Sequence, residues 1–140
     1  MIMNFSTELE TEFKAKQHPE NAVPMAKYMK DLFPFFGIKT DERRAIFKLV
    51  CKKHQTEIDT NTRTIGWELF QKNERELQYC GIEILIKNLK KKYVIEDIVW
   101  IEKLLITNSW WDSVDTISKF ILGDYLQQFP AEIPTVVDRL

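Results

Sequence analysis

The chain has 140 residues, enough for one domain with a substantial hydrophobic core. Its 20 lysines and arginines nearly balance its 21 aspartates and glutamates, so the net charge of −1 provides no global attraction to nucleic acid or to an anionic membrane. Only 4 glycines and 5 prolines interrupt the sequence, which favours helix. A nucleic-acid partner would therefore have to be bound by a local basic surface.

The cysteine usage and the apolar runs predict where the protein works. Cys51 and Cys80 are widely spaced and each lies in an apolar helical pattern, which is typical of free thiols in a reducing compartment. No apolar run approaches about 20 residues, the length of a membrane-spanning helix. The acidic N-terminal region lacks the pattern of a signal peptide. We expect a soluble, cytoplasmic protein that does not associate with membranes.

The first half of the chain shows three helical patterns. Apolar residues spaced four apart predict a helix over residues 5–16, and a second is expected over residues 21–30. An aromatic linker at residues 32–38 follows. Thr40 then predicts a helix N-cap. In this third helix a basic side is expected to be exposed opposite an apolar side; the basic residues are Arg43, Arg44, Lys48, Lys52 and Lys53, and the apolar residues are Ala45, Ile46, Leu49 and Val50.

The second half predicts further amphipathic helices. They are expected from Asn61 or Thr62, over residues 74–91, over residues 95–105 and over residues 110–129. The helix at 74–91 ends in three lysines, Lys90 to Lys92, which suit a helix C-terminus and could also contact phosphate. Another apolar stripe begins at Ile133.

These patterns together predict an all-α fold. No segment alternates with period two for long enough to predict a strand. Helix pairs at roughly forty-residue spacing are typical of HEAT-type arrays, in which each pair stacks on the next, although a compact bundle is an alternative. We expect an α-α superhelix of antiparallel HEAT-like helical pairs, with residues 1–140 as a single domain. The stripe that begins at Ile133 stops at residue 140, so we expect this domain to be the N-terminal part of a longer architecture.

The most informative stretch reads Ser-Trp-Trp-Asp-Ser-Val-Asp and begins at Ser109. Ser109 followed by Asp112 predicts a capping box and a helix that begins at Trp110. Trp110 lies on the apolar stripe of this helix, which is a core face. Trp111 lies about 100° round from it and shares its own face with Asp115, one turn further on. A large aromatic and a carboxylate thus occupy a face that the core does not need.

Other chemistries have little support in the sequence. His18 and His54 have no cysteine or carboxylate partners at metal-ligand spacing. Gly37 and Gly66 are isolated, so there is no glycine-rich phosphate loop. Neither cysteine has a nearby histidine that would activate it as a nucleophile. We therefore expect no metal site.

Four stretches, residues 24–30, 36–44, 109–115 and 122–124, resemble the DNA alkylation repair family of bacterial DNA glycosylases, the AlkD-like proteins. The resemblance implies HEAT-like helical pairs, in agreement with the periodicity. It implies base-excision repair by hydrolysis of the N-glycosidic bond of positively charged alkylated purines, of the 7-methylguanine and 3-methyladenine type, in duplex DNA. It implies no metal or cofactor, and we expect a monomer.

The resemblance also assigns residues. The catalytic acid of the family corresponds to Asp115, and two aromatic residues of the family's catalytic cleft correspond to Trp111 and Tyr28. The matched candidates for phosphate contact are Lys39, Thr40, Arg43 and Arg44. Family members carry further repeats and further cleft residues in a part that would lie beyond residue 140. The alternative hypothesis is a HEAT-like module that binds DNA or protein without catalysis.

Overall fold

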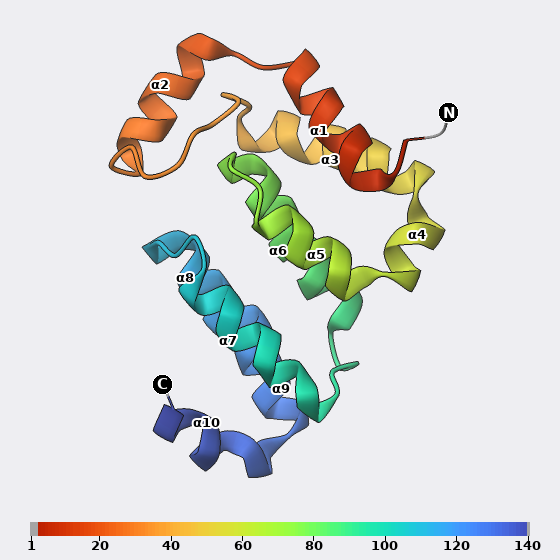
Figure 1. Cartoon of the computed structure of the whole chain (residues 1–140), viewed down its shortest axis with the longest axis vertical. Helices are drawn as coiled ribbons and strands as arrows, with labels where there is room; N and C mark the ends of the chain where they lie inside the picture. Colours follow the sequence, from red (N-terminus) through yellow and green to blue (C-terminus); the bar gives the residue numbers. More distant parts are fainter. Residues whose placement is uncertain (1–2, 140) are drawn as a thin grey trace. The chain divides into compact units, whose positions relative to one another are not determined.

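The computed structural model describes residues 3–139 (Figure 1). Every regular element within that range is helical, which confirms the predicted all-α fold. The chain divides into two compact units, the first ending at Ile84 and the second beginning at Leu85. Each unit is described by itself.

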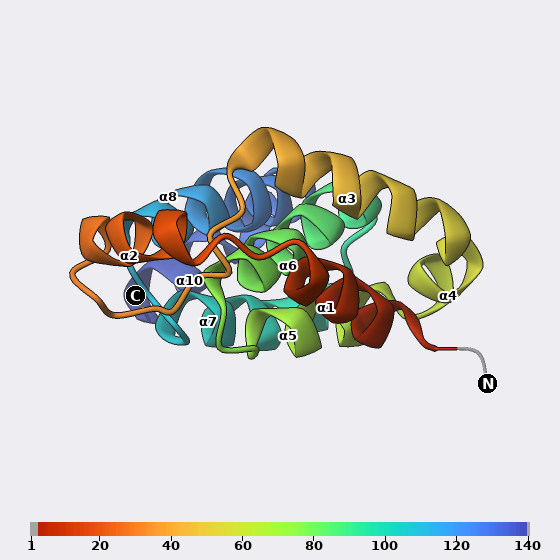
Figure 2. The ribbon, with the colours of Figure 1, turned by 90° about the horizontal axis from the view of Figure 1, so that it is seen from above.

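The first unit is built from paired helices. Its elements are α1 (Phe5–Ala15), α2 (Pro19–Tyr28), α3 (Thr40–Lys53), α4 (Gln55–Thr60), α5 (Thr62–Phe70) and the first part of α6 (Arg75–Leu89). Helix α1 packs along α3, and α5 runs beside α6 (Figure 1 and Figure 2). The predicted stripe of α1 is completely buried. The core side chains are Phe5, Leu9, Phe13, Phe36, Ile38, Ile46, Val50, Ile58, Ile65, Leu69, Leu77, Cys80 and Ile84.

Some local predictions for this unit are wrong. Helix α3 begins at Thr40, but its N-cap is Lys39 and no side chain caps it. Leu49 is 67% exposed, although the apolar stripe predicted that it would be buried. Helix α4 was not predicted, because it is short and buries only Ile58. Such a segment is too short for a 3.6-residue period to stand out.

Helices α5 and α6 approach closely at Gly81. A β-carbon at this position would lie 2.7 Å from the Gly66 carbonyl oxygen and 3.1 Å from the Phe70 backbone nitrogen. We expect Gly81→Ala to destabilise the protein by about 1–3 kcal/mol, because overpacking this contact outweighs the better helix propensity of alanine. Urea unfolding would measure the change. The exposed Thr64→Ala on α5 is the control, and equal stability of Gly81→Ala and wild type would contradict the close approach.

A histidine lies between two carboxylates where α1 meets α3 and α4. His54 Nε2 is 3.1 Å from Glu8 Oε1, and its Nδ1 is 3.4 Å from Glu57 Oε1. The Glu57 carboxylate also accepts from the backbone N–H of Phe5, at 3.1 Å. The hydrogen bond from His54, followed by the contact with Lys53, holds the pKa of Glu8 below its ordinary value. These contacts join the start of α1 to the end of α3.

The lowered pKa of Glu8 predicts a pH-dependent stability. A carboxyl group whose pKa is lower in the folded than in the unfolded chain stabilises the fold above its unfolded pKa, and this contribution is lost as the pH falls through the folded pKa. We expect Glu8→Gln to unfold at lower urea concentration than wild type at neutral pH, and the two midpoints to converge as the pH falls through the folded-state pKa of Glu8. A constant difference between the midpoints over this range would contradict the assignment.

The second unit has its own core. After η1 (Ile95–Asp97), α7 (Ile98–Ile106) packs against α8 (Trp111–Ile117) and the following turn η2 (Ser118–Leu122), which return in the opposite direction (Figure 1). Then come α9 (Gly123–Gln128), η3 (Pro130–Glu132) and α10 (Ile133–Arg139). Its completely buried apolar side chains are Leu85, Ile101, Leu104, Ile117, Ile121 and Tyr125. None of the helices in residues 3–139 is long and apolar enough to span a membrane.

Candidate functional site

The tryptophan-rich stretch starts α8 one residue later than predicted. Trp110 is the N-cap in an extended conformation, and Trp111 is the first helical residue. The capping box of Ser109 with Asp112 does not form. Instead, the Ser113 hydroxyl accepts from the Trp110 N–H at 3.3 Å and donates to the Trp110 carbonyl at 3.2 Å. Ser113 is buried, so this pair of bonds fixes how the helix begins.

Trp111 and Asp115 are one turn apart on α8 and both are exposed. The Trp111 side chain is 51% exposed, a large value for an indole. Asp115 is also exposed, while Ile117 on the opposite side of the helix is completely buried. Residues four apart lie on one helix face. The structure therefore presents an indole and a carboxylate together to solvent, as the helical period predicted.

A π-helical turn follows directly on this pair. In η2 the Gly123 N–H donates to the Ser118 carbonyl, five residues back. The prediction of one uninterrupted α-helix here is therefore wrong. Single π-turns inside helices occur frequently at functional sites. The turn lies three residues beyond Asp115 and is continued by α9.

The third predicted site residue, Tyr28, belongs to the first unit. It is the last residue of α2, and its side chain is 69% exposed. No residue of α2 is fully buried, and its partly buried residues are Asn21, Ala22, Met25 and Ala26. Most of the Tyr28 residue therefore lies at the surface of the first unit.

The four predicted phosphate-binding residues fall into two groups. Lys39, Thr40 and Arg44 are exposed around the start of α3. Arg43 is only 5% exposed, so the expectation that it lies on the exposed side of the helix is wrong. Its guanidinium binds both oxygens of Glu83 on α6, at 2.9 Å and 3.2 Å.

Arg43 is a structural residue because α6 covers this side of α3. Its guanidinium also lies over the Tyr79 ring, 5.4 Å from the centroid, and its Nη1 is 3.7 Å from Cys80 Sγ. Loss of the buried guanidinium would break a bidentate ion pair and leave Glu83 only its 3.7 Å contact with the exposed Arg44, which is costly. Arg43 therefore holds α3 on α6.

The structure also shows the surroundings of the two cysteines and of the residue types that could bind a metal ion. Burial raises the pKa of the Cys80 thiol to about 12, so Cys80 is a protonated core residue at neutral pH. Cys51 is a partly buried free thiol. Over residues 3–139, no group of three or more histidine, cysteine, aspartate or glutamate side chains could hold a metal ion.

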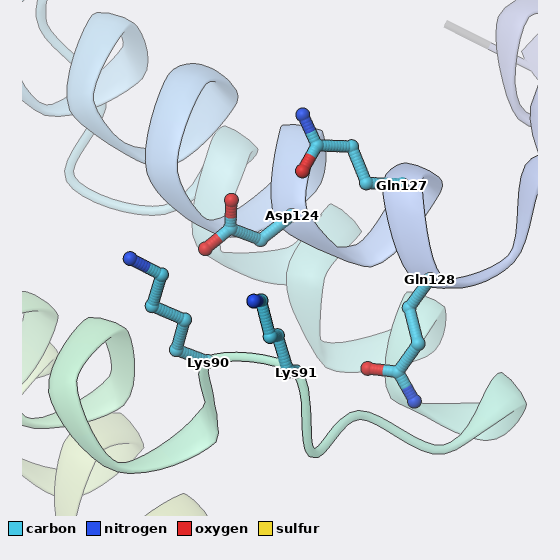
Figure 3. A pocket seen from close by; sticks show the side chains of 5 residues that line it. All are labelled: Lys90, Lys91, Asp124, Gln127 and Gln128. Carbon is cyan, nitrogen blue, oxygen red and sulfur yellow. The ribbon is translucent and has the colours of Figure 1, made fainter.

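A polar pocket in the second unit was only partly foreseen. It is lined by Lys90, Lys91, Asp124, Gln127 and Gln128 (Figure 3). The lysine run marked the first two residues as possible phosphate contacts. The two glutamines were missed, because polar residues on a helix carry no sequence signal that distinguishes a pocket wall from an ordinary solvated face.

The chain is similar to known proteins over most of its length. The sequence profile of a family described as "DNA alkylation repair enzyme" matches residues 9–139. A solved structure described as "Predicted DNA alkylation repair enzyme from Enterococcus faecalis" is 33% identical, with a TM-score of 0.70; the match covers 85% of this chain and 55% of that one. The chain thus spans little more than half the length of this solved relative. No curated protein gives a significant match.

Proposed function

Because the chain belongs to the DNA alkylation repair enzyme family, we propose that it takes part in base-excision repair as a DNA glycosylase. The reaction is hydrolysis of the N-glycosidic bond of positively charged alkylated purines in duplex DNA, such as 7-methylguanine and 3-methyladenine. The observation that supports this most is the exposed pair of Trp111 and Asp115, one turn apart on α8 within the matched segment.

The two side chains suit the chemistry of this bond. As the cationic base departs, positive charge develops on the sugar. The Asp115 carboxylate stabilises this charge or orients the attacking water. The electron-rich face of the Trp111 indole attracts the cationic base, by about 0.5–2 kcal/mol depending on how well water is excluded. The alkylated base is a good leaving group, so the reaction needs no general acid and no cofactor.

We base the remaining proposed roles on which of the predicted site residues are exposed to solvent. Tyr28 is assigned to contact with the substrate, and Lys39, Thr40 and Arg44 are assigned to contacts with the DNA backbone. Two lysine or arginine charges and one hydroxyl can hold phosphates but carry no sequence information. Arg43 is given no DNA contact because it is buried and bound to Glu83, whereas Arg44, 3.7 Å from the same carboxylate, has a side chain that is 65% exposed. We also propose that the protein is a cytoplasmic monomer.

The test is release of the base itself. Duplex DNA treated with a methylating agent is incubated with the protein, and free 7-methylguanine and 3-methyladenine are measured by mass spectrometry. We expect release above that from DNA without protein. DNA binding without release would favour the alternative of a non-catalytic binding module, and the absence of both would contradict the proposal.

A further inference from the structure

The pocket of the second unit is a site that the catalytic proposal does not use. Lys90 and Lys91 follow the end of α6, and Asp124, Gln127 and Gln128 project from α9 (Figure 3). The pocket has a volume of about 290 Å³. The Lys90 and Lys91 side chains extend from their loop toward the Asp124 carboxylate (Figure 3).

The wall that carries the lysines is tied to α9. The side-chain oxygen of Gln128 accepts from the Tyr93 N–H at 2.8 Å, and its side-chain nitrogen donates to the Tyr93 carbonyl. The Tyr125 hydroxyl donates to the Ile95 carbonyl at 2.7 Å. The loop after α6 is therefore held at two points by the helix that faces it. Such anchoring keeps the pocket formed before a ligand arrives.

The charges in the pocket favour an anion. Two lysines and one aspartate give a net charge of +1, since the two glutamines are neutral. Over the described residues 3–139, Asp124 makes no ion pair within 4.0 Å with Lys90 or Lys91. The ammonium groups thus remain available to a ligand. Gln127 adds an amide that can donate a hydrogen bond.

The backbone conformation of Lys91 is a second unusual feature of this pocket. Lys91 lies in the left-handed region with φ of 61°, just beyond the end of α6. Glycine is the usual residue at such a position, because it adopts this conformation without steric cost. Favourable interaction with the helix dipole explains lysines near a helix C-terminus in general. It does not explain why they line a pocket with Asp124 and Gln127.

We propose that this pocket binds a backbone phosphate of duplex DNA. Lys90 and Lys91 bind the phosphate oxygens and Gln127 donates to them, while Asp124 limits the affinity by repulsion. Asp124 lies on α9, nine residues after Asp115 on α8, and the π-turn η2 separates the two helices. The pocket shares no residue with the pair of Trp111 and Asp115, so the phosphate that it binds is a separate contact. The inference rests on the proposed function only in taking duplex DNA as the partner.

Binding of undamaged duplex DNA tests the pocket without any base chemistry. Fluorescence anisotropy with a labelled duplex of about 20 base pairs would be measured over a series of salt concentrations for wild type, for the double variant Lys90→Gln with Lys91→Gln, and for Asp124→Asn. The control is Lys14→Gln with Lys16→Gln, which removes two charges from exposed lysines on and just beyond α1.

Each variant has a defined expectation. For the pocket double variant, the slope of log affinity against log salt should fall by about 0.9, the change expected when one phosphate contact is lost. Asp124→Asn should bind several-fold more tightly. An unchanged slope in the pocket variant, an equal fall in the α1 control, or weaker binding by Asp124→Asn would each overturn the proposal.

Inorganic phosphate distinguishes the source of the bound group. At matched ionic strength, it should displace DNA no better than chloride does, because a DNA strand is held at several phosphates. Displacement specific to phosphate would assign the pocket to a free phosphate compound and overturn the DNA contact. The binding assay and the base-release assay test the two proposals independently. If the pocket variant and wild type have the same salt slope and wild type still releases base, only the proposed phosphate contact is contradicted. If the slopes differ as expected but wild type releases no base, only the glycosylase proposal is contradicted.

Discussion

Asp115→Asn is expected to reduce base release from methylated duplex DNA by at least about 100-fold, the usual size of an effect for removing one charged catalytic group. Asparagine keeps the shape of the side chain and its position on α8 but removes the negative charge. The exposed position of Asp115 makes no buried contact that the change would break. Stability and the DNA affinity of the variant should therefore remain near those of wild type.

The control for this experiment is Asp138→Asn on α10, which neutralises another exposed carboxylate of the same unit. It should release base at the rate of the wild type. Single-turnover kinetics with excess protein would separate the chemical step from product release. Equal rates for wild type and Asp115→Asn would remove Asp115 from the mechanism.

Glu76→Ala is expected to have the largest effect on stability, a loss of about 3–5 kcal/mol. The carboxylate of Glu76 is buried and accepts three backbone hydrogen bonds, from the N–H groups of Phe36, Gly37 and Ile38 at 3.0, 3.0 and 3.1 Å. Burial raises the pKa of Glu76, and these hydrogen bonds oppose that rise. Alanine leaves all three donors without the carboxylate.

The three hydrogen bonds to Glu76 hold the linker between α2 and α3 in its conformation. Gly37 has φ of 91°, and a β-carbon there would lie 2.0 Å from the His18 carbonyl oxygen. The linker therefore depends on glycine for its conformation and on Glu76 for its hydrogen bonds. Glu76→Gln keeps one acceptor oxygen and should lose less stability than Glu76→Ala.

Urea unfolding followed by circular dichroism would measure both Glu76 variants. Glu68→Ala, an exposed change on α5, is the matched control and should stay within about 0.5 kcal/mol of wild type. A loss of similar size in Glu68→Ala and Glu76→Ala would show that the buried carboxylate has no special role. A larger loss for glutamine than for alanine would contradict the hydrogen-bond argument.

The helical period explains most of what could be predicted about the fold and the candidate site. Phe5, Leu9 and Phe13 had to share one face of a helix, and they form part of the core. In the same way Trp111 and Asp115 had to share a face away from Ile117. These conclusions need only the geometry of one helix, because residues four apart are neighbours whatever surrounds them.

Other predictions failed because neighbouring elements decide them. Arg43 and Arg44 are adjacent in sequence and both pair with Glu83 on α6, but only Arg43 is buried, whereas the Arg44 side chain is 65% exposed. Leu49 lies on the apolar side of its helix and still remains exposed. A periodic pattern shows which residues lie on one face but not how much of that face another helix covers.

The sequence by itself determined the helical class, the approximate helix boundaries and the pairing of Trp111 with Asp115, since all three depend on local backbone geometry. Only the tertiary structure decided that Glu76 would bind the linker and that Arg43 would be buried. It also decided that Lys90 and Lys91 would line one pocket with Asp124. These groups bring together residues 33 to 40 positions apart, and their formation depends on how helices pack rather than on any local pattern.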